Sequence, residues 1–312
     1  MSITVVGSVA LDTITTPFGK IERGLGGAAT HFSVSASFFT GVNLVGVVGE
    51  DFPQEHIDFL ASRHVNLTGL QIVKNGKTFY WVGGYDHNLN QAQTYETHLN
   101  VFENFRPVLP DPYKNSKILF LANIDPDLQR HVIEQAGKPE IIGLDTMNLW
   151  ITHKKQSLVE TIKRVNIITI NDSEARMLTG LPNLVQAAKM VQSWGPKTVI
   201  IKRGEYGALL FHGNIIFSAP ALPLEKVYDP TGAGDSFAGG FFGFYDRCRD
   251  KNFETMKTAV ICGSVMASFN VEKFSCDRLR TLKIEDVQAR FGEFESLAKF
   301  EDMGPLPKGD GI

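Results

Sequence analysis

Short runs of β-branched and aliphatic residues alternate along the chain with longer segments in which apolar residues recur every three or four positions. The first pattern predicts buried strands and the second predicts helices with one apolar face. The predicted strands are 3–7, 44–49, 118–122, 141–145, 166–170, 198–202, 208–212 and 215–218. The predicted helices are 28–39, 54–64, 126–135, 154–163, 173–179, 183–194, 235–248, 253–270 and 284–297. Continuous apolar strands alternating with helices indicate a largely parallel sheet covered on both faces.

One region departs from this alternation. Residues 77–85 (KTFYWVGGY) and 91–97 have the pattern of aromatic strands joined by a polar turn, and residues 12–21 are a candidate third strand beside them. Such a group of strands predicts a small β-flap projecting from the main sheet, and a flap of this kind can close over a site. An ordinary surface hairpin fits the same residues, so the pattern alone leaves both interpretations open.

Composition narrows the class of protein. The chain has 312 residues, of which 43% are hydrophobic and 21% charged, and its formal net charge is −3. We expect a sizeable core and no nucleic-acid partner, because no long run of Lys or Arg is present. The first residues lack the features of a signal peptide, and no apolar stretch approaches the ~18 residues of a membrane span. Three cysteines without CxxC spacing predict free thiols and a reducing, cytoplasmic location.

The segment VYDPTGAGDSF, which precedes a predicted helix, carries the most specific chemistry. Gly232, Ala233 and Gly234 are small enough for backbone N–H groups to approach an anion, and the helix would add its positive dipole end. Asp235 follows at once. It is either an N-cap or a general base that takes the proton of a hydroxyl attacking phosphorus. Alignment and charge neutralisation by the backbone amides suit phosphoryl transfer.

The part of this segment from 229 to 237, DPTGAGDSF, resembles the C-terminal signature of the ribokinase, or phosphofructokinase-B, family of carbohydrate and nucleoside kinases. Four other segments follow the order and spacing of that family. The resemblance implies a ribokinase-like α/β fold, a three-layer α/β/α sandwich with a mostly parallel sheet of about eight or nine strands and a small β-sheet lid. Residues 1–312 then form one kinase domain, with the lid inserted at about 12–21 and 77–100.

Two segments near the start resemble the family's acceptor-binding motifs. In GSVALD, the final Asp12 corresponds to the residue that binds acceptor hydroxyls, although a strand-end turn also fits it. In GLGGAATH, the pair Gly26 and Gly27 corresponds to glycines that let the backbone approach the acceptor. His31 stands where the family usually has Asn, and either side chain can hydrogen-bond a hydroxyl. The resemblance therefore implies an acceptor site at these four residues.

A third segment, NDSE, resembles the family's Asn-x-x-Glu motif. The resemblance places Asn171 near the nucleotide phosphates and Glu174 on the water network around Mg²⁺. This is chemically reasonable, because Mg²⁺ keeps several waters and needs few direct carboxylates. The alternative is a helix-start Asn followed by an acidic first turn.

A fourth segment, KRGEYG, follows a predicted strand and resembles the nucleotide-binding turn, with Gly204 and Gly207 giving room to the nucleotide. Many family members carry a hydroxyl residue where Lys202 stands. Lys202 is either a point charge on a phosphate or a solvated strand-end residue. The adenine pocket is expected against the helix that carries Cys262 and Gly263, although a close contact between helices needs equally small residues there.

The resemblance also implies a monovalent cation such as K⁺, bound by Asp229 and the Thr231 carbonyl. The later half of that site usually includes a Gly, and here the corresponding stretch, 271–275, reads VEKFS. Cation dependence is therefore left open.

The sequence thus predicts an ATP- and Mg²⁺-dependent kinase that transfers the γ-phosphoryl group to a hydroxyl of a sugar or sugar-like small molecule. A nucleoside kinase of the same fold is the alternative, and a catalytically silent regulator is the alternative of another class. A dehydrogenase is disfavoured, because the GxGxxA at residue 24 does not follow a core strand. Members of the family often dimerise through the lid, so the resemblance allows a homodimer there, while the sequence leaves the oligomeric state open.

Overall fold

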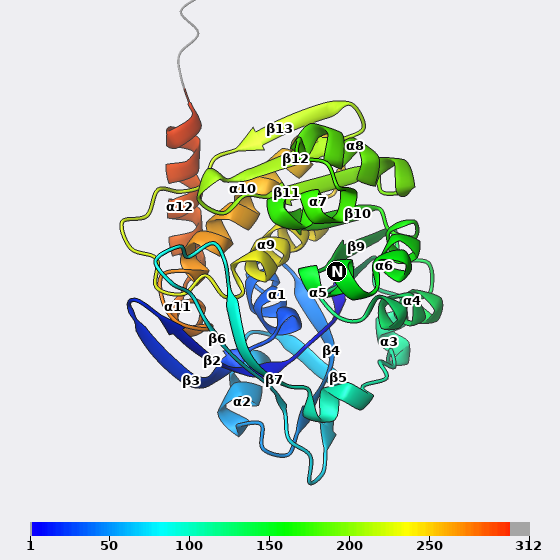
Figure 1. Cartoon of the computed structure of the whole chain (residues 1–312), viewed down its shortest axis with the longest axis vertical. Coiled ribbons are helices and arrows are strands. Elements are labelled where there is room, and N and C mark those ends of the chain that lie inside the picture. Colours follow the sequence, from blue (N-terminus) through cyan, green and yellow to red (C-terminus); the bar gives the residue numbers. More distant parts are fainter. Residues whose placement is uncertain (1, 300–312) are drawn as a thin grey trace, which may run out of the picture.

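The structure, a computed structural model, describes residues 2–299. Its main element is a nine-stranded sheet with the order β13-β12-β11-β10-β9-β8-β1-β4-β5 (Figure 1). The strands are β1 Ser2–Val6, β4 Gly41–Gly49, β5 Val65–Val73, β8 Ile118–Leu121, β9 Ile141–Asp145, β10 Ile167–Asn171, β11 Thr198–Lys202, β12 Ala208–His212 and β13 Ile215–Ala219. All neighbouring pairs from β11 to β5 are parallel, and only β12 and β13 are antiparallel additions at one edge.

Helices cover both faces of this sheet. Alternate side chains of a strand point to opposite faces, and here the side chains on both faces are apolar and need to be buried. Ile3 and Val5 of β1 belong to one buried cluster, whereas Val6 belongs to the other. The first face packs against α1 Ala28–Ala36, α2 Gln54–Ser62, α9 Ala233–Arg247, α10 Phe253–Asn270, α11 Asp277–Thr281 and α12 Ile284–Ala298. The second packs against α3 Asp111–Lys114, α4 Pro126–Gln135, α5 Asn148–His153, α6 Lys155–Ile162, α7 Asp172–Thr179 and α8 Leu184–Trp194. The predicted three-layer sandwich with a mostly parallel sheet is confirmed.

A separate four-stranded sheet with the order β3-β2-β6-β7 lies at one side of the main sheet (Figure 1). Its strands are β2 Ala10–Thr16, β3 Gly19–Gly26, β6 Phe79–Gly84 and β7 Gln93–His98, and the 3₁₀ helix η1 Asn100–Asn104 follows it. We call this second sheet the lid sheet. It contains the segments in which the lid is expected, about 12–21 and 77–100. Its strand β3 extends beyond them, and the last residues of β3 belong to the glycine-rich segment that ends at His31.

The candidate site lies where the parallel strands of the main sheet end. In-register pairing places Asp145 of β9, Asn171 of β10 and Lys202 of β11 at the same carboxyl edge. The 3₁₀ turn η2, Gly204–Tyr206, follows β11 there. Ligands of open α/β sheets bind at this edge. Within residues 2–299, no helix combines the length and apolar character needed to cross a membrane.

Candidate active site

The glycine-rich loop before α9 forms a cradle of backbone N–H groups. Gly232 has φ 74° and ψ 0°, and a Cβ there would lie 2.4 Å from the His31 ring, so only glycine fits. The main-chain N–H groups of Gly232 and Gly234 have no acceptor among residues 2–299. They lie at the N-terminus of a 15-residue helix, whose dipole places positive potential at the same point. The cradle is therefore suited to an anion.

Asp235 lies in the first turn of α9 and is partly buried. Gly232 occupies the N-cap position, so the alternative that Asp235 is the N-cap does not hold. Burial raises the pKa of Asp235 to about 7; the charge of Asp145 raises it further and Lys202 opposes the rise. A carboxylate with a pKa near neutrality is well matched to general base catalysis at physiological pH.

A buried ion pair lies beside the cradle. Lys202 Nζ lies 2.6 Å from Asp145 Oδ2, and the two side chains are 15% and 5% exposed. A Cβ on Gly234 would lie 3.0 Å from Lys202 Nζ, so the ammonium group sits at the first turn of α9. Burial alone would lower the pKa of Lys202, but the carboxylates of Asp145 and Glu174 raise it overall. Lys202 is therefore a fixed cation next to the anion cradle, and Asp145 is a partner that sequence motifs did not assign to it.

Asn171 and Glu174 form a capping box at the start of α7. Asn171 Oδ1 accepts from the Glu174 N–H at 2.7 Å, and Glu174 Oε2 accepts from the Asn171 N–H at 2.8 Å. The helix-start interpretation thus describes their local contacts. Glu174 Oε1 has no hydrogen-bond partner among residues 2–299. Burial raises the pKa of Glu174 to about 7, with Lys202 opposing and Asp145 adding to the rise. A buried carboxylate with one free oxygen fits an outer-sphere contact to hydrated Mg²⁺.

Asp12 and the glycine pair lie together on the side of the lid sheet. Asp12 is 6% exposed, and a Cβ on Gly26 would lie 1.9 Å from Asp12 Oδ2. Gly27 has φ 97°, and a Cβ there would lie 2.5 Å from the Ser8 carbonyl oxygen. Burial raises the pKa of Asp12 to about 7, with further rises from the charges of Asp229 and Asp235. The glycines thus leave room for a carboxylate that shares its surroundings with the candidate base.

His31 lies beneath the anion cradle. Its ring packs against Gly232, and its Nδ1 lies 3.0 Å from Asn270 Oδ1. Its Nε2 is buried and has no partner among residues 2–299. Burial lowers the pKa of His31 to about 4, so the ring is neutral at physiological pH. The predicted contact between His31 and the acceptor stays a prediction.

Residues of the lid sheet and its connecting turn contact two segments of the candidate site: the glycine-rich segment at Thr231 and the predicted nucleotide-binding turn at Gly204. The Tyr85 hydroxyl, just after β6, accepts a hydrogen bond of 3.3 Å from Thr231 Oγ1. Burial raises the pKa of Tyr85, so its hydroxyl stays protonated. In the turn before β7, Asn90 Oδ1 lies so close to Gly204 that a Cβ on that residue would be 2.4 Å away. Gly204 and Gly207 have φ 54° and 80°, which glycine adopts without strain.

Cys262 and Gly263 are buried in the contact between α9 and α10. A Cβ on Gly263 would lie 2.8 Å from the Phe237 carbonyl oxygen, so close helix packing accounts for this glycine. Their predicted role as walls of the adenine pocket stays a prediction.

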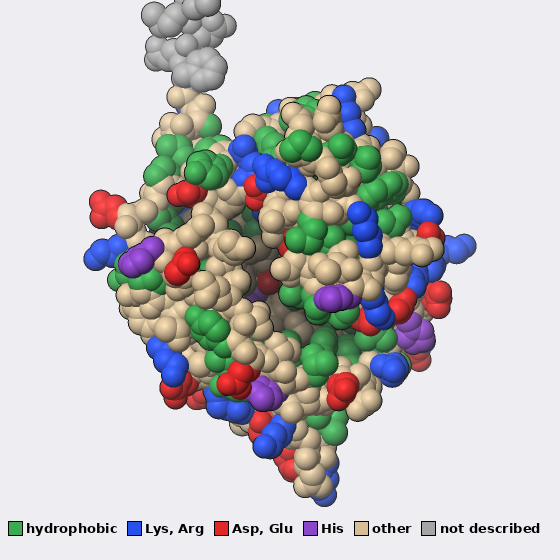
Figure 2. Space-filling model, viewed as in Figure 1, with side chains coloured by type: hydrophobic (Ala, Val, Ile, Leu, Met, Phe, Trp, Pro, Cys, Tyr) green, Lys and Arg blue, Asp and Glu red, His purple; other side chains and the backbone are tan. Residues whose placement is uncertain are grey.

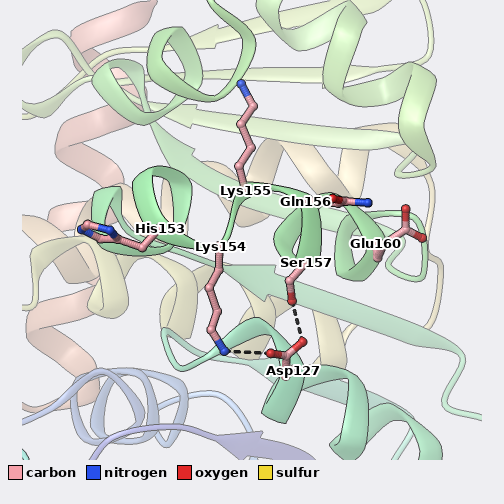
Figure 3. Close-up of a pocket in the computed structure, with 7 residues that line it drawn as sticks. All are labelled: Asp127, His153, Lys154, Lys155, Gln156, Ser157 and Glu160. Atoms are coloured by element: carbon pink, nitrogen blue, oxygen red, sulfur yellow. Dashed lines mark hydrogen bonds and ion pairs between the residues drawn. The ribbon is translucent and has the colours of Figure 1, made fainter.

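The face that carries the lid sheet is hollowed at its centre, with acidic side chains deep inside the hollow (Figure 2). A second, shallow depression lies apart from it, between α4 and α6 (Figure 3). There Lys154 Nζ lies 2.7 Å from Asp127 Oδ2, and Ser157 Oγ donates to Asp127 Oδ1 at 2.7 Å. These polar groups satisfy one another, so this depression is explained as a junction between helices.

Comparisons with known proteins agree with this geometry. Residues 2–281 match the family model described as pfkB family carbohydrate kinase. The chain is 33% identical over 255 residues to the cytidine kinase of Thermococcus kodakarensis, covering 80% of this chain and 90% of the relative. It is 26% identical over 289 residues to the nucleoside kinase of Methanocaldococcus jannaschii, covering 88% and 91%. The crystal structure of that nucleoside kinase superposes with a TM-score of 0.75 at 22% identity, covering 94% and 98% of the two chains.

Proposed function

Because the chain belongs to the pfkB family of carbohydrate kinases and is therefore a phosphotransferase with an alcohol acceptor, we propose that it phosphorylates a hydroxyl of a nucleoside. Kinases of this family use ATP with a divalent metal. The nucleoside acceptor is supported by the relatives: a cytidine kinase at 33% identity and nucleoside kinases from two further organisms at 26%. A cytidine-like pyrimidine nucleoside is the first candidate among them.

The observation that carries the mechanism is the position of Asp235 beside backbone N–H groups that have no acceptor in the described part of the chain, residues 2–299. The γ-phosphoryl group of ATP is proposed to lie at the N–H groups of Gly232 and Gly234, with Lys202 as the neighbouring cation. The acceptor oxygen bonds to the γ-phosphorus while the bond from that phosphorus to the β–γ bridging oxygen breaks and ADP leaves. Asp235 takes the hydroxyl proton in this step and releases it to solvent when the products depart. The amides and Lys202 offset the charge on the transferred group.

The remaining predicted residues take supporting roles in this proposal. Asp12, Gly26 and Gly27 line the acceptor side, and the second carboxylate oxygen of Glu174 would hold a water molecule of a bound Mg²⁺ ion. The metal, when bound, neutralises phosphate charge. Asn171, Gly204, Gly207, Cys262 and Gly263 stay the proposed nucleotide contacts. Tyr85 closes the lid sheet over the cradle and excludes water that would otherwise accept the phosphoryl group.

Assembly and location belong to the same proposal. We propose pairing of two chains through the lid sheet, because its edge strand β7 is exposed at every residue. A reducing, cytoplasmic location is supported by the three free cysteines, Cys248, Cys262 and Cys276.

The test is ADP formation from MgATP with a matched panel of cytidine, uridine, adenosine, inosine, ribose and fructose, with products identified by mass spectrometry. We expect a nucleoside monophosphate as product and a higher kcat/KM for a nucleoside than for any free sugar. Turnover of free sugars alone would overturn the nucleoside acceptor and leave the kinase. Binding of ADP without turnover of any acceptor would favour the silent regulator instead.

A further inference from the structure

Asn270, the last residue of α10, has no exposed surface and makes three hydrogen bonds to the segments around the anion cradle. Its Nδ2 donates to the Thr231 carbonyl at 2.8 Å. Its Oδ1 accepts from Ser236 Oγ at 3.0 Å and lies 3.0 Å from His31 Nδ1. Since Oδ1 is an acceptor only, the neutral His31 ring must carry its proton on Nδ1. One amide thus joins Thr231, just before α9, and Ser236, in the first turn of α9, to His31 of α1.

This amide fixes the direction of an N–H group in the cradle. The Thr231 carbonyl and the Gly232 N–H belong to one planar trans peptide, so the two groups point in opposite directions. Asn270 holds the carbonyl on the inner side, and the Gly232 N–H therefore faces away from Asn270, toward the cradle. The His31 ring, packed under Gly232, closes the inner side. Preorganised donors of this kind stabilise developing charge because they need no reorientation during the reaction.

The oxygen atoms that would bind a monovalent cation, those of the Asp229 carboxylate and the Thr231 carbonyl, all accept hydrogen bonds within the protein. Asp229 is fully buried, and its Oδ1 accepts from the Thr231 N–H and its Oδ2 from the Ser275 N–H, both at 2.9 Å. The Thr231 carbonyl accepts from Asn270 Nδ2. Ser275 has φ 56°, and its hydroxyl donates to the Leu25 carbonyl. A K⁺ ion needs a ring of oxygens directed at it, and here each of these three oxygens already gives one of its lone pairs to an N–H donor. With these oxygens held by N–H donors, the residues present fit the implied cation poorly.

We propose that Asn270 is a positioning residue that holds the phosphoryl-binding loop in place of a monovalent cation, so that turnover is independent of K⁺. The proposal rests on the role proposed above for this loop. Asn270 acts on the reaction through the Thr231–Gly232 peptide and touches neither substrate.

The first test compares two isosteric changes, Asn270→Asp and Asn43→Asp. Asn43 is a matched control: it is also a buried asparagine with three polar side-chain partners, Ser2, Thr4 and Ser116, but it lies at the opposite edge of the sheet. Asn270→Asp keeps Oδ1 and removes the donor to Thr231. We expect kcat to fall about 10²-fold, with KM for the acceptor and the Kd of ADP within several-fold of wild type. Asn43→Asp should lower the midpoint of thermal unfolding and leave kcat unchanged.

Equal kcat losses in the two variants, or an undiminished kcat in Asn270→Asp, would overturn the positioning role. Ser236→Ala serves as a second variant if Asn270→Asp does not fold. It removes one donor to Oδ1 and should lower kcat in the same direction by a smaller factor.

The second test measures wild-type protein in KCl, NaCl and choline chloride at matched ionic strength. We expect kcat, the Kd of ADP and the midpoint of thermal unfolding to agree among the salts, with kcat within about twofold, because a cation bound to the native state would raise stability. Activation and stabilisation specific to K⁺ would overturn the inference. The ADP and unfolding measurements need no acceptor, so they test this inference even if the proposed nucleoside is wrong.

Discussion

Replacing Lys202 by Met tests the electrostatics of the site most sharply. The change removes the cation from a buried pair with an N–O distance of 2.6 Å and leaves the Asp145 carboxylate, which is 5% exposed, without its partner. Breaking a buried pair in this way costs about 3–5 kcal/mol of stability. Removing both charges in Lys202→Met/Asp145→Asn should restore most of that loss, because no uncompensated charge stays buried.

The assay is urea unfolding of the two single variants and the double variant, analysed as a double-mutant cycle. Lys154→Met is the control, since Lys154 also pairs with carboxylates, those of Asp125 and Asp127, each at 2.7 Å, but is 37% exposed. That variant should lose about 1 kcal/mol or less. If Lys202→Met loses no more stability than Lys154→Met, the reasoning about the buried pair is refuted.

The same variant should also move the pH dependence of turnover. The charge of Lys202 lowers the pKa of Asp235, which burial raises to about 7. A base works in its ionised form, so kcat/KM in wild type should fall as the pH drops through about 7. Lys202→Met should shift this acidic limb to higher pH. A limb that stays in place or moves to lower pH contradicts the proposed contact between the two charges.

Three further predictions concern the lid sheet, the metal and the acceptor side. Tyr85→Phe removes the acceptor for Thr231 Oγ1 and should raise KM for the acceptor by a factor matching about 1 kcal/mol, measured by steady-state kinetics. Glu174→Gln should raise the Mg²⁺ concentration for half-maximal activity, and an unchanged Mg²⁺ titration would contradict the role proposed for Glu174. Asp12→Asn should stabilise the protein by at most about 4 kcal/mol above pH 7 and by nothing below pH 4, because the raised pKa of Asp12 costs stability only once the pH exceeds the unfolded value of 3.8. Urea unfolding at both pH values checks it.

The layers of the fold were predictable because strands that are buried on both faces appear in the sequence as continuous apolar runs. Two strands escaped the pattern. β5, Val65–Val73, is an edge strand with exposed residues at several positions, so its apolar run is interrupted. β3, Gly19–Gly26, is exposed at half of its residues and rich in charge and glycine, and it is a strand because β2 pairs with it. β3 pairs with β2 across the short turn at residues 17–18, and a strand whose own residues lack an apolar pattern is not visible from that pattern in a single sequence.

The kinase class was equally predictable, because the glycine-rich segment and its Asp are contiguous and specific. The partners of that segment were not. Asn270 is 39 residues from Thr231 and 239 from His31, and Tyr85 is 146 from Thr231. Contacts over such separations leave no periodicity and no motif. A buried Asn at a helix end is the only signal that singles out Asn270, and it needs the structure to be interpreted.

The most direct test of the central claim is turnover by Asp235→Asn. Kinetics with MgATP and the nucleoside identified in the panel should show kcat lowered by about 10²–10⁴-fold, while calorimetry finds ADP and nucleoside affinities within several-fold of wild type. Near-normal turnover in this variant would contradict the account, because the carboxylate at the start of α9 would then have no part in deprotonating the acceptor.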